Sequence, residues 1–208
     1  MYYKRLLTIL SALLILASVT QAQSVTKIKV GTFNPKNARA GLIVGFTTGQ
    51  KVDERLDFGF GADLFIRKFS QESQVDTSTT SGGTTTSGIE TEIEYSMYAL
   101  PLMVHLDFNI MPETVLKPYI GIAGGYEILF SHEANYLTGE KQSRFYGGFG
   151  WQMMIGAEFP IGHQSALLGE ILYNGCVAKR SKGSNEQGLP LHEELNFSGL
   201  GFRVGLRF

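Results

Sequence analysis

Apolar and polar residues alternate along much of this chain, and its last ten residues show the alternation most plainly. Apolar side chains occupy every second position there, with arginine or glycine between them. Successive residues of a β-strand point to opposite faces, so this pattern predicts a closing strand with one apolar and one polar face. The apolar set is Leu200, Phe202, Val204, Leu206 and Phe208.

Segments with the same period of two recur eight times along the chain, separated by turn residues. Short turns alternate with longer connections at 70–92, 131–144 and 179–196, which fits a barrel with one simple and one elaborate rim. An even number of antiparallel strands also leaves both chain ends on one side of a membrane. The pattern predicts an all-β fold, a closed eight-stranded antiparallel up-and-down barrel. The segments lie near 26–33, 38–48, 54–69, 93–108, 116–130, 145–159, 165–178 and 197–208.

One segment does not keep a single parity. Tyr95 and Met97 lie on one parity, whereas Leu102 and Val104 lie on the other. A β-bulge near 98–101 would turn both sets to the outer face. It would also place Tyr95 among the aromatic residues that form bands at the two membrane surfaces. The other residues expected in these bands are Phe130 and Phe145 at one rim and Phe108, Phe159 and Phe208 at the other.

The inward positions of the expected barrel carry six cations and six anions. An eight-stranded barrel is only wide enough for side chains to fill it, so balanced charges predict ion pairs that plug the interior. A narrow channel for a small solute is the alternative use of a polar interior. The predicted network comprises Lys27, Lys29, Arg67, Lys117, Arg203 and Arg207 with Asp57, Asp63, Asp107, Glu127, Glu158 and Glu170.

The first 22 residues predict a cleaved signal peptide. Lys4 and Arg5 precede an apolar run of 14 residues, and small residues follow up to Ala22, after which cleavage is expected. A membrane-spanning helix needs ~20 apolar residues, so an uncleaved anchor is the less favoured alternative. Residues 23–208 then form the barrel domain.

Composition and charge exclude two classes of protein. Loss of Lys4 and Arg5 changes the net charge from −1 to −3, so the mature chain has no basic surplus for nucleic acid. The mean hydropathy of +0.01 excludes a helical membrane protein but fits strands that are apolar on one face. Cys176 is the only cysteine, and its parity predicts a small buried residue rather than a disulfide or a reactive thiol.

One compact group could in principle carry catalysis. His163, Gln164 and Ser165 lie close to Glu170 in the sequence, and a Ser/His/Glu set is what attack on a lipid ester requires. The group falls at a short turn on the side of the chain ends, away from the outer leaflet, so a solvated turn is the favoured interpretation. We expect no catalytic, cofactor-binding or metal-binding site, because no histidine has metal-ligand spacing and no glycine-rich loop precedes a helix.

The run YALPLMVHLDF, followed after a turn by LKPYIGIAGGY, a glycine-rich strand and a closing strand that ends in Arg207-Phe208, resembles the porin-like family of eight-stranded outer-membrane β-barrels. The resemblance implies a place in the outer membrane of a Gram-negative bacterium, with both termini in the periplasm. It implies contact with outer-membrane lipid and lipopolysaccharide. It also implies that Phe208 and its alternate apolar partners are recognised by the barrel-assembly machinery.

The long connections are where a specific activity is expected. Residues 77–88 read TSTTSGGTTTSG, which cannot bury apolar surface and should be hydrated, either as a shield or as an adhesive surface. The sequence therefore predicts a structural or surface-interaction protein with a possible extracellular ligand at 70–92, 131–144 and 179–196. A narrow diffusion channel is the second hypothesis, and a lipid-modifying enzyme is the third.

Overall fold

The computed structural model describes residues 23–77, 86–136, 138–162, 165–184 and 190–208. The expected cleavage after Ala22 and the centre of the Ser/Thr/Gly run lie outside these residues. None of the described segments is a helix of the length and apolarity that crossing a membrane requires. The strands are β1 Ser24–Pro35, β2 Gly41–Lys51, β3 Leu56–Thr77, β4 Thr86–Asn109, β5 Lys117–Asn135, β6 Glu140–Pro160, β7 Ala166–Ser184, β8 Pro190–Asn196 and β9 Gly199–Arg207.

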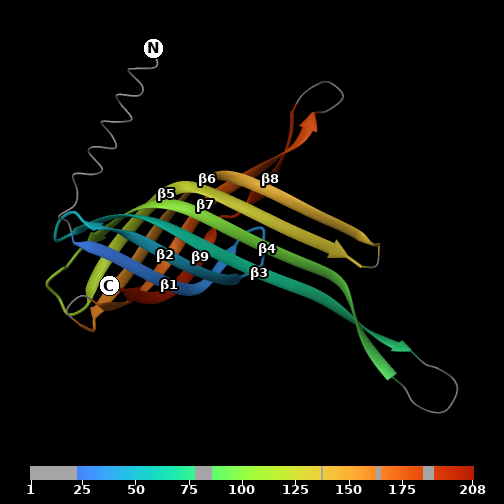
Figure 1. Ribbon diagram of the computed structural model, residues 1–208, viewed down its shortest axis with the longest axis horizontal. Coiled ribbons are helices and arrows are strands. Elements are labelled where there is room, and N and C mark those ends of the chain that lie inside the picture. Colours follow the sequence, from blue (N-terminus) through green and yellow to red (C-terminus); the bar gives the residue numbers. More distant parts are fainter. Residues whose placement is uncertain (1–22, 78–85, 137, 163–164, 185–189) are drawn as a thin grey trace.

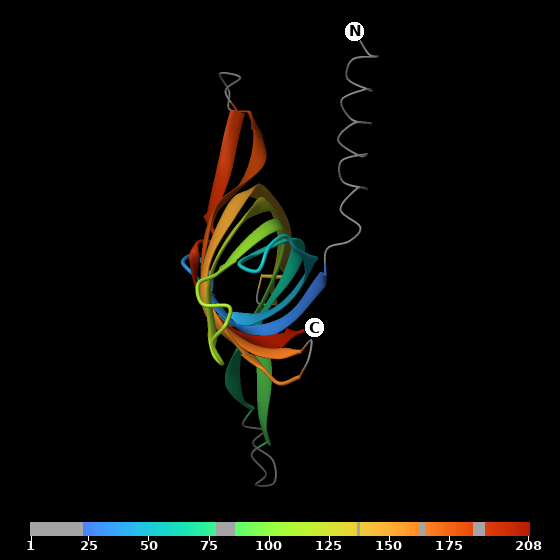
Figure 2. The same ribbon diagram turned by 90° about the vertical axis from the view of Figure 1, so that its left-hand side faces the viewer.

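The strands close into a ring, which is visible end-on in Figure 2. Neighbours along the chain pair antiparallel, and β9 closes the ring by pairing with β1 from Lys27↔Arg207 to Pro35↔Gly199. The short strand β8 pairs with the outer part of β7, and β9 pairs with its inner part. Since β8 and β9 therefore form one interrupted strand, the ring has eight members and the predicted closed barrel is confirmed.

The three long connections are largely strand, so their prediction as loops was wrong. β3 and β4 continue through most of 70–92, β5 and β6 through most of 131–144, and β7 and β8 through most of 179–196. Figure 1 shows these hairpins projecting beyond the ring at the end opposite the C-terminus. The period of two is lost there because residues outside the membrane need no apolar face, while the backbone ladder still forms.

The bulge expected near 98–101 is absent from the described part of β4. Its pairing with β5 is continuous from Ile93↔Asn135 to Asn109↔Tyr119, and the shift against β3 lies further out, at Gln71/Glu72. Met97 is fully buried, whereas Leu102 is 45% exposed on the other face. Tyr95 is half-buried on the inner parity with Met97, so its assignment to the outer aromatic residues was wrong. Apolar residues occupy the inner face near Met97 and the outer face near Leu102, because the barrel interior is itself apolar around Met97.

Candidate functional site within the barrel

Arg203 and Lys29 form ion pairs with carboxylates in the middle of the barrel interior. Arg203, on β9, has no exposed surface, and its Nη1 lies 2.8 Å from Oδ1 of Asp63 on β3. Its Nε donates to Oε1 of Glu170 on β7 at 2.6 Å. Lys29 Nζ lies 3.2 Å from the same Glu170 oxygen, and the hydroxyl of Tyr119 also donates to Glu170. Arg203 thus ties β9 to a strand that is not its neighbour in the sheet.

A second charged group lies nearer the chain ends. Lys27 Nζ is 3.0 Å from Oδ2 of Asp107 and 2.9 Å from Oε1 of Glu158. Arg207 completes the group, 2.5 Å from the other Glu158 oxygen and 3.3 Å from Asp57. Because Lys27 contacts three carboxylates and Arg207 two, no single pair can move without disturbing its neighbours.

Three members of the predicted network do not join these ion pairs. Glu127 is fully buried and accepts a hydrogen bond from the Asn174 amide at 3.3 Å, but its Oε1 has no partner among the described residues. Arg67 and Lys117 make no ion pair with any residue that the structure describes. Both are only partly buried, and they lie near opposite ends of the barrel wall.

An apolar layer fills the interior on the hairpin side of the charges, and the sequence analysis missed it. The rings of Phe33, Phe65 and Phe197 pack together with centroids 5.1–5.8 Å apart. Met97 and Leu129 are buried in the same cluster. The signal was present in the sequence, because Phe33 shares the parity of the inward lysines of β1. The described interior therefore contains two layers of buried side chains, one ionic and one apolar, rather than charges alone.

The group considered for catalysis is not assembled in the described residues. His163 and Gln164 lie outside them, and Ser165 lines the cavity at the chain-end rim. Glu170 is 2% exposed and held by Lys29 and Arg203. Its carboxylate therefore already serves two cations inside the barrel. In the part of the chain that the structure describes, no three metal-ligating side chains gather.

The β7–β8 hairpin is attached to the barrel rim by polar contacts outside the membrane-spanning part. The Tyr146 hydroxyl donates to Glu193 at 2.8 Å, and Arg180 and Lys182 contact the same carboxylate at 2.8 and 3.1 Å. The Tyr146 hydrogen bond, followed by the Lys182 and Arg180 contacts, lowers the pKa of Glu193 to about 2. Glu193 therefore stays charged, and its contacts persist, until the pH falls to about 2.

The outer surface of the ring is almost entirely apolar. Phe149 is 72% exposed, Ile155 68% and Ile171 59%, while Glu158 and Glu170 of the same strands are buried inside the ring. The closing strand follows the same rule, since Leu200 and Phe202 are 60% and 55% exposed and Arg203 is fully buried. Val204, Leu206 and Phe208 are also exposed. A water-soluble protein does not expose so much contiguous apolar surface, so lipid must surround this ring.

An apolar exterior around a charged interior defines a transmembrane β-barrel of the outer-membrane type. Residues 9–208 match the family model of the outer membrane protein beta-barrel domain, and the chain belongs to this family. It is therefore an outer-membrane protein. No curated protein matches the sequence.

Solved structures share the fold at low sequence identity. A major outer membrane protein from Thermus thermophilus is 11% identical, with 89% of this chain and 99% of that one covered and a TM-score of 0.53. OprG from Pseudomonas aeruginosa is 11% identical, with coverages of 89% and 95% and a TM-score of 0.51. Ail of Yersinia pestis, in complex with the heparin analogue sucrose octasulfate, is 10% identical, with coverages of 89% and 97% and a TM-score of 0.51.

Proposed function

We propose that this protein is a non-conducting outer-membrane barrel that presents its three long hairpins at the cell surface for interaction with an extracellular ligand. The observation that carries the proposal is the filled interior. A side-chain ion-pair network spans the barrel on the chain-end side, and an aromatic cluster spans it on the hairpin side. A hydrated solute path would have to cross both layers, which disfavours the narrow diffusion channel.

The hairpins suit a surface role because their described parts are paired strands rich in polar residues. β5 and β6 extend to Asn135 and from Glu140, and the structure pairs them up to these residues. The hairpin of β7 and β8 carries exposed ion pairs, including Lys179 with Glu194 at 2.8 Å. Rigid strands present side chains at fixed positions, so a ligand can bind without first ordering a loop. In this orientation the short turns and both termini face the periplasm.

The closing strand β9 is the part of the barrel that we expect the barrel-assembly machinery and the surrounding lipid to contact. The backbone of Phe208 exchanges two hydrogen bonds with Thr26, of 2.7 and 2.9 Å, so the terminal residue is held in the sheet. Its ring is 47% exposed on the lipid side. Before β9 pairs with β1 and the ring closes, this strand with its outward aromatic end offers the barrel-assembly machinery an unpaired edge to bind. Lipid and lipopolysaccharide then surround the mature ring.

Recordings from planar lipid bilayers test the closed interior. Purified barrel should insert without producing reproducible conductance steps, because neither layer leaves a continuous hydrated path. A wide porin added to the same membranes shows that inserted channels can be detected, and boiled protein controls for leakage caused by unfolded chain. Uniform steps that scale with the amount of folded protein would overturn the non-conducting role.

Epitope tags test the orientation of the hairpins. A tag inserted at Gly139, whose φ of 73° marks the turn between β5 and β6, should be detected by antibody on intact cells. The matched tag at Asp53, in the short turn between β2 and β3, should be detected only after the outer membrane is permeabilised. The opposite result would place the hairpins in the periplasm and exclude a surface role.

A further inference from the structure

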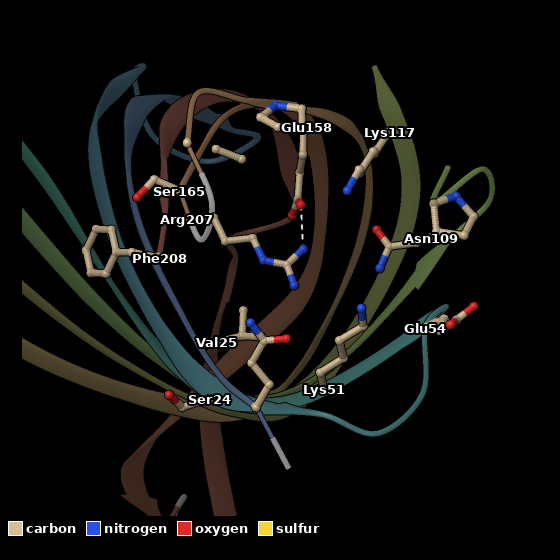
Figure 3. Close-up of a pocket in the computed structure, with 15 residues that line it drawn as sticks. Ser24, Val25, Lys51, Glu54, Asn109, Lys117, Glu158, Ser165, Arg207 and Phe208 are labelled. Atoms are coloured by element: carbon tan, nitrogen blue, oxygen red, sulfur yellow. Dashed lines mark hydrogen bonds and ion pairs between the residues drawn. The ribbon is translucent and has the colours of Figure 1, made fainter. Parts of the chain in front are cut away.

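A cavity opens at the barrel end where the described residues begin and end. Its volume is about 270 Å³, and it is bounded on one side by the ion-paired group of Arg207 and Glu158. Figure 3 shows the side chains that surround it. Lys51 comes from the end of β2, Asn109 from the end of β4 and Lys117 from the start of β5. With Arg207 of β9, four strands therefore contribute hydrogen-bond donors to one cup.

Two of these donors carry positive charge that no carboxylate neutralises locally. Lys51 and Lys117 form no ion pair with any residue in the described ranges, although Lys117 lies opposite Glu158 in the sheet. Figure 3 shows both ammonium groups directed into the cavity, whereas the Glu54 carboxylate is directed away from it. The Glu158 carboxylate is already occupied by Lys27 and Arg207.

The side chains that line the cavity carry a small positive balance. Three cations line it, against two carboxylates, of which Glu158 is ion-paired with Arg207 and Glu54 is directed away from the cavity. A cup with low-dielectric walls and a surplus of one sign concentrates ions of the opposite sign. The cations are Lys51, Lys117 and Arg207, and the carboxylates are Glu54 and Glu158.

We propose that this cup binds a phosphate group, between the ammonium groups of Lys51 and Lys117 and above the guanidinium of Arg207. A phosphate offers several charged oxygens in a tetrahedral arrangement, which suits donors that approach from four strands better than the two oxygens of a carboxylate. The volume exceeds the share of a single water, about 30 Å³, several-fold, so a small organic substituent can accompany the phosphate. The site is independent of the surface role.

The phosphate can come from a free anion or phosphate ester, or from the headgroup of an inner-leaflet phospholipid. Titration of the folded barrel in a nonionic detergent with inorganic phosphate, followed by amide chemical shifts in NMR, addresses the free anion. A parallel titration with short-chain phosphatidylglycerol addresses the headgroup. Saturable shifts with inorganic phosphate would identify the free anion as sufficient, and shifts with the phospholipid alone would identify the headgroup.

Lysine variants decide whether the shifts arise in the cup. Lys51→Met and Lys117→Met should each weaken binding about tenfold, because each removes one full charge from the phosphate shell. Lys179→Met, which removes an exposed lysine on the β7–β8 hairpin, should leave binding unchanged. Folding of every variant is checked by its gel migration before and after boiling. The proposal is overturned if neither probe produces saturable shifts, or if the two cup variants bind as tightly as the Lys179 control.

Discussion

Replacing Arg203 with methionine is expected to lower the free energy of unfolding by about 3–5 kcal/mol, the largest effect of any single charge removal in this barrel. The side chain is fully buried and contacts both Asp63 and Glu170. Its loss leaves two carboxylates in the interior with Lys29 as the one cation that contacts them among the described residues. Urea unfolding of the barrel in lipid vesicles, followed by tryptophan fluorescence of Trp151, measures the change.

Two further variants test whether the loss of stability comes from leaving buried carboxylates without their cation. Lys179→Met also removes a cation from an ion pair, but its pair with Glu194 is more than half exposed and should contribute no more than about 0.5 kcal/mol. Adding Asp63→Asn to the Arg203 variant should recover part of the lost stability, since it removes one uncompensated charge. A loss below about 1 kcal/mol for Arg203→Met would show that the interior carboxylates find other partners or water.

Replacing Phe65 with alanine is expected to cost about 3–5 kcal/mol, because the vacated space lies inside a closed ring and cannot be refilled. The ring is fully buried and packs edge-on against Phe33 and at 5.3 Å from Phe197. The same urea titration measures the loss. Phe149→Ala is the control, because its side chain is 72% exposed on the outer face, where fluid lipid fills the space. Equal losses for the two variants would contradict a packed interior.

The Phe65→Ala variant also tests whether the ion-pair layer blocks the barrel interior to ions without the aromatic cluster. It should remain non-conducting, because the ion pairs of Arg203 and Lys27 still span the barrel beneath the missing ring. Planar-bilayer recordings of the variant beside the unaltered barrel measure this. Conductance steps that appear with Phe65→Ala alone would show that the aromatic cluster is the only seal.

The strand pattern was predictable from the sequence wherever lipid lies outside and side chains fill the inside. The predicted closed barrel requires its first segment, near 26–33, to pair with its last, near 197–208, and β1 and β9 do pair, from Lys27↔Arg207 onward. The prediction was wrong where the strands leave the lipid and where the interior is no longer polar. Beyond the membrane the outer face need not be apolar, so the hairpins were taken for loops. At Tyr95 and Met97 the interior itself becomes apolar, so inward residues were interpreted as outward ones and a bulge was added.

The sequence by itself determined which face of the barrel each strand residue occupies, because alternation is a local property of the β backbone. It placed Arg203 inside and Phe202 outside. Only the tertiary structure decided which groups meet, because contacts across the interior depend on ring closure and on the stagger of strands distant in sequence. Closure brings Arg203 to Asp63, 140 residues away. It also packs Phe65 edge-on against Phe197 and directs Lys51 and Lys117 into one cup.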